Sequence, residues 1–316
     1  MTKNVALCCL SHSPLLRRVD PGAGVRAGVD AALAHAKDFA EKFDPDLVVI
    51  FGPDHYQGFR YEIMPPFCVG TAARSIGDYD TAAGPLSVPQ QLADALIEHL
   101  LASDLDVAMS EAMVVDHGIA QPLETLFGGS GVKPVIPIFI NSLADPLGPP
   151  RRARLLGAAV GSFIRQLDCK VLVMGSGGLS HDPPVPLLRE SPPEVAEFLI
   201  SRRRTEEEQR QREEAVLAAG LNFAAGRTDL RPLNPQFDRE FLELLASGDL
   251  ERFDAFSTAE LTARAGHSIH EVRTWVAAHA ALAACGPYES TYSFYQPVPE
   301  WIIAFSVTTA LPLQIG

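Results

Sequence analysis

The sequence predicts an α/β fold in which a central, mostly parallel sheet is flanked by helices and carries the active site at the carboxyl edge of its strands. Four short apolar runs, at residues 5–10, 47–51, 135–140 and 171–174, are separated by longer segments with helical periodicity. Continuous apolarity over so few residues is typical of a strand that is buried on both faces. Alternation of such strands with helices favours a parallel order.

The segments between and after these runs predict the other elements. Helical periodicity indicates helices over residues 27–43, 88–101 and 151–167. Residues 200–216 mix arginine and glutamate, which is typical of a solvated helix with i,i+4 charge pairs. We expect residues 236–285 to be helical, with Trp275, Ala278 and Leu282 at core spacing, and residues 292–313 to return as a strand. These segments predict one catalytic domain over residues 1–316, with a helical C-terminal region at about 200–285 packed on it.

Composition excludes several classes of function. The 316 residues include 39 acidic and 26 basic side chains, and the net charge of −13 disfavours a nucleic-acid partner. No apolar stretch reaches the ~18–20 residues that a membrane-spanning helix needs, so no membrane partner is expected. The five cysteines form no CxxC motif, which is typical of reduced thiols and predicts a cytoplasmic protein.

Four of the nine histidines lie where chemistry is expected. His12, His55 and His181 each follow one of the apolar runs, and His117 follows a shorter apolar stretch. Loops at the carboxyl ends of parallel strands meet at one edge of the sheet, where ligands bind. Imidazoles are common ligands for zinc and iron and move protons near neutral pH. The sequence therefore predicts one convergent histidine site.

An open metal site with two histidines also needs a carboxylate. Spacing leaves four candidates open, namely Asp54, Asp116, Glu124 and Glu271. A weaker alternative is that His267 and His270, three residues apart, share a helix face as ligands. The glycines in the segment 175–178 are expected to let the backbone approach a ligand or to make a tight turn before His181.

Several motifs around these histidines occur together in a known family. They are Ser-His-Ser-Pro at 11–14, Gly-Pro-Asp-His-Tyr at 52–56, Val-Asp-His-Gly at 115–118 and Gly-Ser-Gly-Gly-Leu-Ser-His at 175–181. The segments at 61–70, 118–124, 232–235, 270–277 and 297–301 extend the likeness nearly end to end. With these motifs in this order, the chain resembles the class III extradiol ring-cleaving dioxygenases, the superfamily of the catalytic subunit of protocatechuate 4,5-dioxygenase.

The resemblance implies a residue-by-residue assignment of the site. By motif position, His12, His55 and Glu271 match the ligands of a mononuclear Fe(II), His181 matches the base that acts on a catechol, and His117 matches a second acid/base group, here the acid. It also implies a homo-oligomer. The implied reaction is extradiol (meta) cleavage of a catechol by O₂ in aromatic-acid catabolism. The likeness is closest to members that act on 2,3-dihydroxyphenylpropionate, and it implies 2,3-dihydroxycinnamate as a second substrate.

Other functions remain open at this stage. They are cleavage of another catechol, zinc-dependent hydrolysis on the same scaffold, and binding without catalysis. A substrate carboxylate calls for an arginine or lysine partner. The sequence does not rank the candidates, which are Arg17, Arg18, Arg60, Arg74 and Arg273. Asp54 and Asp116 are hypotheses for residues that orient the ligand imidazoles.

Overall fold

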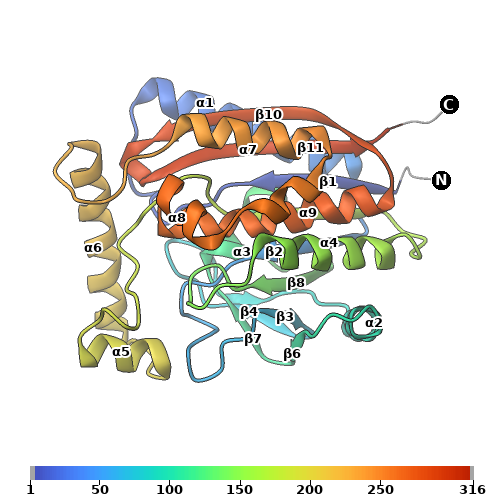
Figure 1. The fold of residues 1–316 in the computed structure, drawn as a ribbon, viewed down its shortest axis with the longest axis horizontal. Helices are drawn as coiled ribbons and strands as arrows, with labels where there is room; N and C mark the ends of the chain where they lie inside the picture. The colour runs from blue at the N-terminus through green and yellow to red at the C-terminus, as the bar shows by residue number, and fades with distance from the viewer. Residues whose placement is uncertain (1–3, 314–316) are drawn as a thin grey trace.

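The computed structural model describes residues 4–313 and is built around an eight-stranded sheet (Figure 1). The order across the sheet is β10 (Tyr288–Val298), β11 (Ile303–Pro312), β1 (Val5–Leu10), β9 (Val171–Ser176), β2 (Leu47–Gly52), β8 (Val135–Ile140), β3 (Phe67–Gly70) and β6 (Ala108–Ser110). The central strands β1, β9, β2 and β8 are parallel to one another, and all of their residues are buried. The predicted fold class is confirmed.

The register of the parallel strands brings their carboxyl ends level. Leu10 of β1 is paired with Ser176 of β9, and Phe51 of β2 is paired with Gly175. The loops that follow these strands therefore emerge side by side at one edge of the sheet. Antiparallel pairing begins outside this core, where β11 pairs with β1 and β3 pairs with β8.

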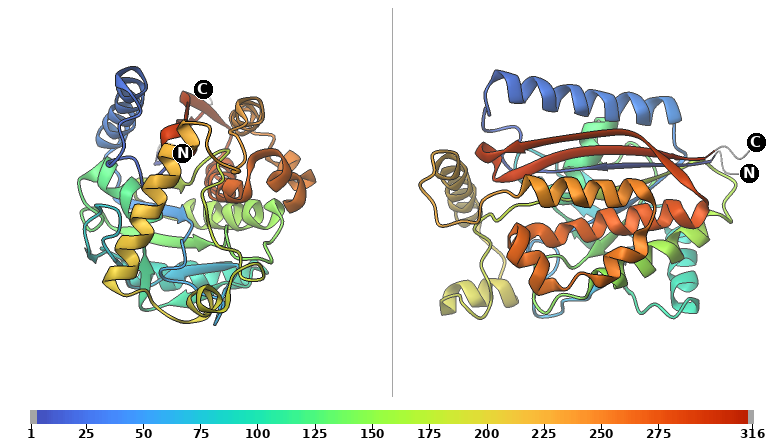
Figure 2. Two further views of the ribbon diagram at one scale, coloured as in Figure 1. Left: turned by 90° about the vertical axis from the view of Figure 1, so that its left-hand side faces the viewer. Right: turned by 45° about the horizontal axis from the view of Figure 1, so that its top comes forward.

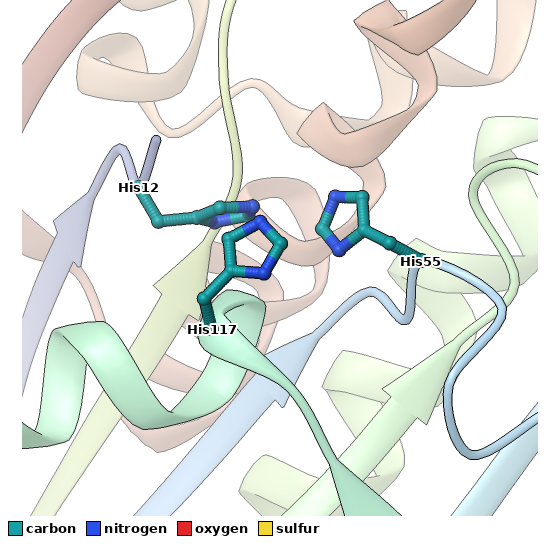
Figure 3. A group of neighbouring side chains, drawn as sticks. All are labelled: His12, His55 and His117. Carbon is teal, nitrogen blue, oxygen red and sulfur yellow. The ribbon is translucent and has the colours of Figure 1, made fainter. Parts of the chain in front are cut away.

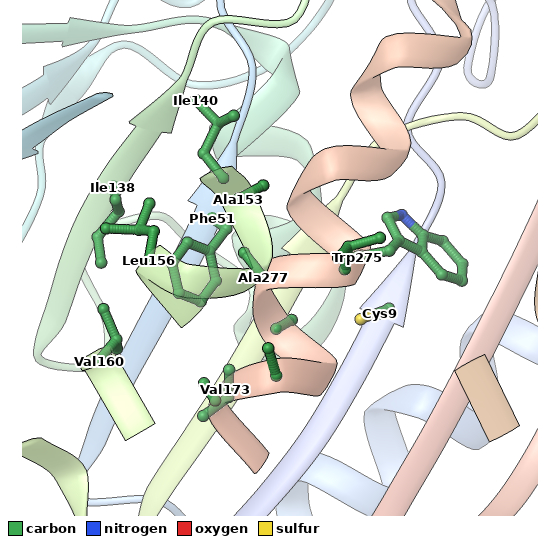
Figure 4. Packing of buried hydrophobic residues seen from close by; sticks show 14 of the residues in the cluster. Cys9, Phe51, Ile138, Ile140, Ala153, Leu156, Val160, Val173, Trp275 and Ala277 are labelled. Atoms are coloured by element: carbon green, nitrogen blue, oxygen red, sulfur yellow. The ribbon is translucent and has the colours of Figure 1, made fainter. Parts of the chain in front are cut away.

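Helices cover both faces of the sheet. On one face, α4 (Pro150–Ile164) and α9 (Val272–Cys285) pack on the central strands (Figure 4). Helix α2 (Gln90–Ala102) lies beside α4. On the other face lie α1 (Ala23–Phe43) and α3 (His117–Phe127), and the right-hand view of Figure 2 shows α1 running along β10 and β11. Trp275, Ala278 and Leu282 are fully buried, as their spacing predicts.

Helices α4 and α9 approach each other closely because glycines line their contact. Gly157 and Gly161 of α4 face the backbone carbonyl groups of Ala277 and Ala281 in α9. A Cβ atom at either glycine would collide with those carbonyl oxygens. The absence of a side chain therefore sets how near α9 lies to α4, and with it the position of the residues that precede α9.

The C-terminal half differs from the prediction in three places. The charged helix α6 (Glu206–Ala224) begins only after Thr205, whose side chain accepts a hydrogen bond from the Glu208 backbone N–H in a capping box. The helical region 236–285 is divided into α7 (Pro235–Ser247), α8 (Thr258–Ala265), α9 and short 3₁₀ turns. Gly248 and Gly266, with φ of 76° and 92°, end α7 and α8. The single strand predicted at 292–313 is a hairpin of β10 and β11, interrupted by a 3₁₀ turn at Pro299–Trp301.

Two helices stand apart from the layers. The short α5 (Pro193–Ile200) leads to α6, which stands at the carboxyl edge of the parallel strands, at the left in Figure 1. The left-hand view of Figure 2 looks onto this side and shows α6 crossing in front of the sheet.

A small sheet of β5 (Gly84–Pro85), β4 (Ala73–Ser75) and β7 (Met113–Val115) leads into α3. Within residues 4–313, no helix is long and apolar enough to cross a membrane.

Candidate metal centre and substrate pocket

The predicted histidines converge at the carboxyl edge of the sheet. His12 lies two residues beyond β1, His55 three beyond β2 and His181 five beyond β9, while His117 begins α3. Figure 3 shows the rings of His12, His55 and His117 gathered together. Their ring centres are 4.4 Å apart for His55 and His117, 5.3 Å for His12 and His55, and 5.4 Å for His12 and His117.

Glu271 comes to this group from the other end of the chain. It closes a 3₁₀ turn directly before α9, and only 1% of its surface is exposed. Its Oε1 atom lies 3.3 Å from Nε2 of both His55 and His181, and its Oε2 atom lies 3.7 Å from Nε2 of His12. Of the four candidate carboxylates, this is the one that faces the imidazole Nε2 atoms. Structure and sequence motif thus bring the same five residues together.

Two of the imidazoles are held by neutral acceptors. Nδ1 of His12 lies 2.9 Å from the Ser176 hydroxyl oxygen, and that hydroxyl donates to the Gly118 carbonyl. Because the hydroxyl proton is used there, the Ser176 oxygen accepts the Nδ1 proton of His12. Nδ1 of His181 donates to the carbonyl of Leu179 at 2.7 Å. In both rings Nε2 is left with a lone pair that points into the site.

The other two imidazoles are each held by a buried aspartate in the same way. Asp116 accepts hydrogen bonds from the backbone N–H of His55 at 2.7 Å and from its Nδ1 at 3.0 Å. Asp78 accepts from the backbone N–H of His117 at 2.8 Å and from its Nδ1 at 2.7 Å. Burial opposes ionisation of Asp116, but the neighbouring His55 outweighs it and holds the pKa of Asp116 well below its usual range.

This geometry favours a cation between the side chains. With the ring protons on Nδ1, the imidazoles and Glu271 present acceptors to one another and no donor, so a proton or a metal ion must separate them. Burial lowers the pKa of His12 to about 3, so this ring offers a lone pair at neutral pH. Nε2 of His117 is buried, and no residue within 4–313 forms a hydrogen bond with it.

The electrostatics of His55 lead to the same conclusion. Burial lowers its pKa, but the carboxylates of Asp116 and Glu271 outweigh burial and raise it well above the usual range. One positive charge is therefore favoured at this point, and a divalent ion supplies it as well as a proton does. Ring nitrogens of His12, His55 and His117 also lie within 4.8 Å of one another. Imidazole and carboxylate donors suit a divalent transition metal, so the residues fit such an ion.

Glycines at the end of β9 make room for this arrangement. A Cβ atom at Gly177 would lie 2.7 Å from Cβ of Glu271. One at Gly178 would lie 2.8 Å from the ring of His181. The backbone N–H of Gly178 donates to Oε2 of Glu271 at 2.9 Å, so the close approach also fixes the carboxylate.

A pocket opens over the histidines. Its wall is largely apolar, with Leu15, Val185, Val216 and Ile303 among the lining residues, and the ring of Tyr79 stands edge-on to His117 at 4.8 Å between centres. Concave apolar walls with a few convergent polar groups are typical of small-molecule sites, and a planar aromatic ring suits this one.

Two arginines from the charged segment also line the pocket, and the sequence analysis missed them. They are Arg204, just before α6, and Arg212 within it. Burial lowers the pKa of Arg204 to about 10 and also lowers the pKa of Arg212. The charge pattern of residues 200–216 predicts a solvated helix and contains no signal for the face that turns inward.

The arginines proposed from sequence lie elsewhere, and none of the five lines the pocket. Arg17 and Arg18 form ion pairs with Glu124, Asp80 and Glu213. Arg60 donates to the Gln57 carbonyl, and Arg273 donates to the Gly148 carbonyl. Arg74 lies on β4 and does not line the pocket.

The remaining candidates have structural partners. Asp54 accepts three backbone N–H groups, from Gln57, Gly58 and Phe59, and shapes the loop after His55. The ring of His267 bonds to Asp182, whereas the ring of His270 bonds to Thr262. The two histidines therefore have separate partners and do not act together as a pair of metal ligands. Asp78, Ser176 and Asp238, which anchors Ser180 next to His181, are further positioning residues that the sequence did not reveal.

Fold and site together define an α/β protein with a histidine–carboxylate centre suited to a metal ion. Residues 6–306 match the family model described as the catalytic LigB subunit of aromatic ring-opening dioxygenase. The chain belongs to this family, and the resemblance drawn from its motifs is confirmed.

Curated relatives agree with this placement, and a solved structure shares the fold. A protein from Rhodococcus sp is 54% identical over 311 residues, covering 98% of this chain and 99% of its own length. One from Mycolicibacterium paratuberculosis is 52% identical over 309 residues, with the same coverage. Both are named 2,3-dihydroxyphenylpropionate/2,3-dihydroxicinnamic acid 1,2-dioxygenase. The crystal structure of an uncharacterized Escherichia coli K12 protein has a TM-score of 0.50 at 13% identity, covering 96% of this chain and 98% of its own, and shows the fold alone.

Proposed function

We propose that the protein cleaves the catechol ring of 2,3-dihydroxyphenylpropionate, and of 2,3-dihydroxycinnamate, by extradiol oxidation with O₂ at an Fe(II) centre. The observation that carries the proposal is the convergence of three imidazole Nε2 atoms on Glu271 beneath an apolar pocket. The names of relatives at about half identity over nearly the full chain support this choice of substrate.

We assign the metal ligands to His12, His55 and Glu271. His12 and His55 are the two imidazoles that belong both to the group around Glu271 and to the cluster of ring nitrogens with His117. His181 belongs only to the first group and His117 only to the second. Two histidines and one carboxylate form the facial set of a non-haem Fe(II) site, which leaves adjacent positions open. When bound, the iron supplies those positions to the two reactants and a path for electrons between them.

The two remaining histidines handle protons. His181 keeps its Nδ1 proton on the Leu179 carbonyl, so its Nε2 lone pair is free to accept the proton of a catechol hydroxyl. His117 has the carboxylate of Asp78 behind its ring, which accepts the Nδ1 proton and aims Nε2 at the pocket, and we assign His117 as the acid. The apolar pocket wall excludes water from these transfers.

The test is oxygen consumption by anaerobically purified, Fe(II)-reconstituted protein given 2,3-dihydroxyphenylpropionate, with the visible absorbance of the product followed in parallel. We expect one yellow ring-fission product for each O₂ consumed. Protein loaded with Zn²⁺ should consume none. Absence of uptake from iron-loaded protein with a panel of catechols would reject the proposal.

Single replacements separate ligands from proton carriers. His117→Ala and His181→Ala should lower turnover by about 10²–10⁴-fold, the range for loss of a general acid or base, and leave the iron content near normal. His12→Ala and Glu271→Ala should lose iron. Metal analysis of each purified variant checks the division, and iron loss in His117→Ala or His181→Ala would show that it is wrong.

A further inference from the structure

We infer that Arg204 and Arg212 form the binding site for the carboxylate of the substrate side chain, a deduction that rests on the proposed function. Both arginines line the same pocket as the histidine centre, and both come from the segment that stands across the carboxyl edge of the sheet (Figures 1 and 2). The five arginines considered from sequence do not reach this pocket.

The placement of α6 directs Arg212 into the pocket. Arg212, Val216 and Gly220 follow at intervals of four residues and share one face of the helix. Val216 lines the pocket beside Arg212, and Gly220 lies against Leu15 and the backbone of Glu300. A Cβ atom at Gly220 would lie 2.6 Å from the Glu300 carbonyl oxygen, so the glycine lets α6 lie close to the body of the protein.

The two arginines contact neutral groups, and the nearby Glu208, which acts to raise the pKa of Arg204, is bound by Arg202. Within residues 4–313, neither guanidinium has a carboxylate at ion-pair distance. Arg212 donates to the carbonyl of Pro184 at 2.8 Å, and Arg204 lies over the ring of Phe198 at 3.7 Å. The two cations also lie near enough to disfavour each other, because Arg212 adds to burial in lowering the pKa of Arg204.

Two other arginines of the same segment are paired with glutamates of α6. Arg202 bonds to Glu208, Arg210 bonds to Glu207, and neither arginine lines the pocket. Glu213, next to Arg212 in sequence, is bound by Arg18 at 2.6 Å. The two arginines that face the pocket therefore have no carboxylate partner from this segment.

Two partly buried guanidinium groups without an ion-pair partner are costly, and an anionic ligand group offsets that cost. A carboxylate is the complement that a planar guanidinium binds through paired hydrogen bonds. The catechol hydroxyls, by contrast, suit the imidazoles and the metal. The pocket therefore offers the arginines to the carboxylate end of a dihydroxyphenyl acid and the imidazoles and the metal to its catechol end.

The test compares an acidic substrate with a neutral one of similar length, 2,3-dihydroxyphenylpropionate and 3-propylcatechol. In Arg212→Met and Arg204→Met we expect KM for the acid to rise about 10- to 100-fold, the range for loss of a charge-assisted hydrogen bond. KM for 3-propylcatechol, kcat for both substrates and iron content should stay within about twofold. Arg212→Lys should recover part of the loss. The matched control is Arg210→Met, which removes an exposed arginine of the same helix.

The outcomes separate this inference from the proposed function. Equal changes with both substrates, or wild-type protein that cleaves both with the same kcat/KM, would overturn the carboxylate site and leave ring cleavage intact. Wild-type protein that cleaves neither would overturn the proposed function. In that case calorimetry with 3-phenylpropionate still decides the inference: weaker binding in Arg212→Met than in Arg210→Met supports it, and equal binding rejects it.

Discussion

Replacement of Asp116 by asparagine tests how the metal centre is held. Asp116 receives three hydrogen bonds: its Oδ2 accepts from the backbone N–H and Nδ1 of His55, and its Oδ1 accepts from the Gly118 N–H at 2.9 Å at the start of α3. Asparagine has the same shape but only one side-chain oxygen. Its NH₂ group therefore replaces one of the two carboxylate oxygens and faces an N–H donor. If the oxygen stays on His55, the Gly118 N–H loses its acceptor.

The magnitudes follow from these contacts. Loss of the helix N-cap costs about 1 kcal/mol of unfolding free energy, and a buried N–H without a partner costs up to ~3 kcal/mol. A neutral amide is also a weaker acceptor for the Nδ1 proton of His55 than a carboxylate, so the ligating Nε2 is less basic. Loss of such an outer partner lowers metal affinity about 10- to 100-fold, equivalent to about 1.4–2.7 kcal/mol.

Asp78→Asn is the matched control, because Asp78 holds His117 as Asp116 holds His55. Anaerobic competition with a chelator measures iron affinity, and thermal unfolding reports the structural cost. We expect Asp116→Asn to bind iron about 10- to 100-fold more weakly, because His55 loses its carboxylate partner. Asp78→Asn should keep iron within about threefold of wild type and lose turnover, because its partner carries a proton. Equal iron loss in both variants would make His117 a ligand, and unchanged affinity in Asp116→Asn would refute the role of Asp116.

Three further predictions concern packing and metal removal. Gly177→Ala places a methyl group against Glu271, so iron content and kcat should fall while far-ultraviolet circular dichroism is unchanged; normal iron content would contradict the close approach. Gly157→Val overfills the contact with Ala277, so urea unfolding should show a free energy of unfolding that is about 1–3 kcal/mol lower. An unchanged unfolding midpoint would mean that α4 and α9 can separate freely. Anaerobic chelation should lower Tm in proportion to RT ln(1 + [Fe]/Kd), and added Fe(II) should restore it; a Tm indifferent to iron would deny binding to the folded state.

The core of the fold could be predicted from sequence because its strands are buried on both faces. β1 and β8 have the predicted bounds, and β2 and β9 extend one and two residues further. The small sheet and β6 could not be predicted, since strands of two or three residues are too short for periodicity. The sequence predicts one strand in place of the C-terminal hairpin because the turn at Pro299–Trp301 ends in the apolar residues Trp301 and Ile302, which continue the apolar pattern.

Site residues can be predicted from sequence where the topology of the sheet fixes their position. His12, His55 and His181 follow parallel strands whose ends must meet, so their position alone predicts convergence. Glu271 lies before a helix that packs across the sheet, and no spacing rule connects it to those strands; family resemblance alone identified it. Arg212 shows the opposite difficulty, because a charge pattern does not tell which face of a helix is buried.

The position of Glu271 depends on how α9 is fastened to β9. Thr274 Oγ1 donates to the Ser176 carbonyl at 2.7 Å, and Trp275 Nε1 donates to the Gly177 carbonyl at 3.1 Å. Ser176 also orients His12, and Gly177 is the residue against which Glu271 packs. One dipeptide at the end of β9 therefore fixes both an imidazole and the carboxylate of the proposed centre. Because the first turn of α9 is held at two successive carbonyls, it cannot shift without breaking buried hydrogen bonds, so the donor set is fixed before any metal binds.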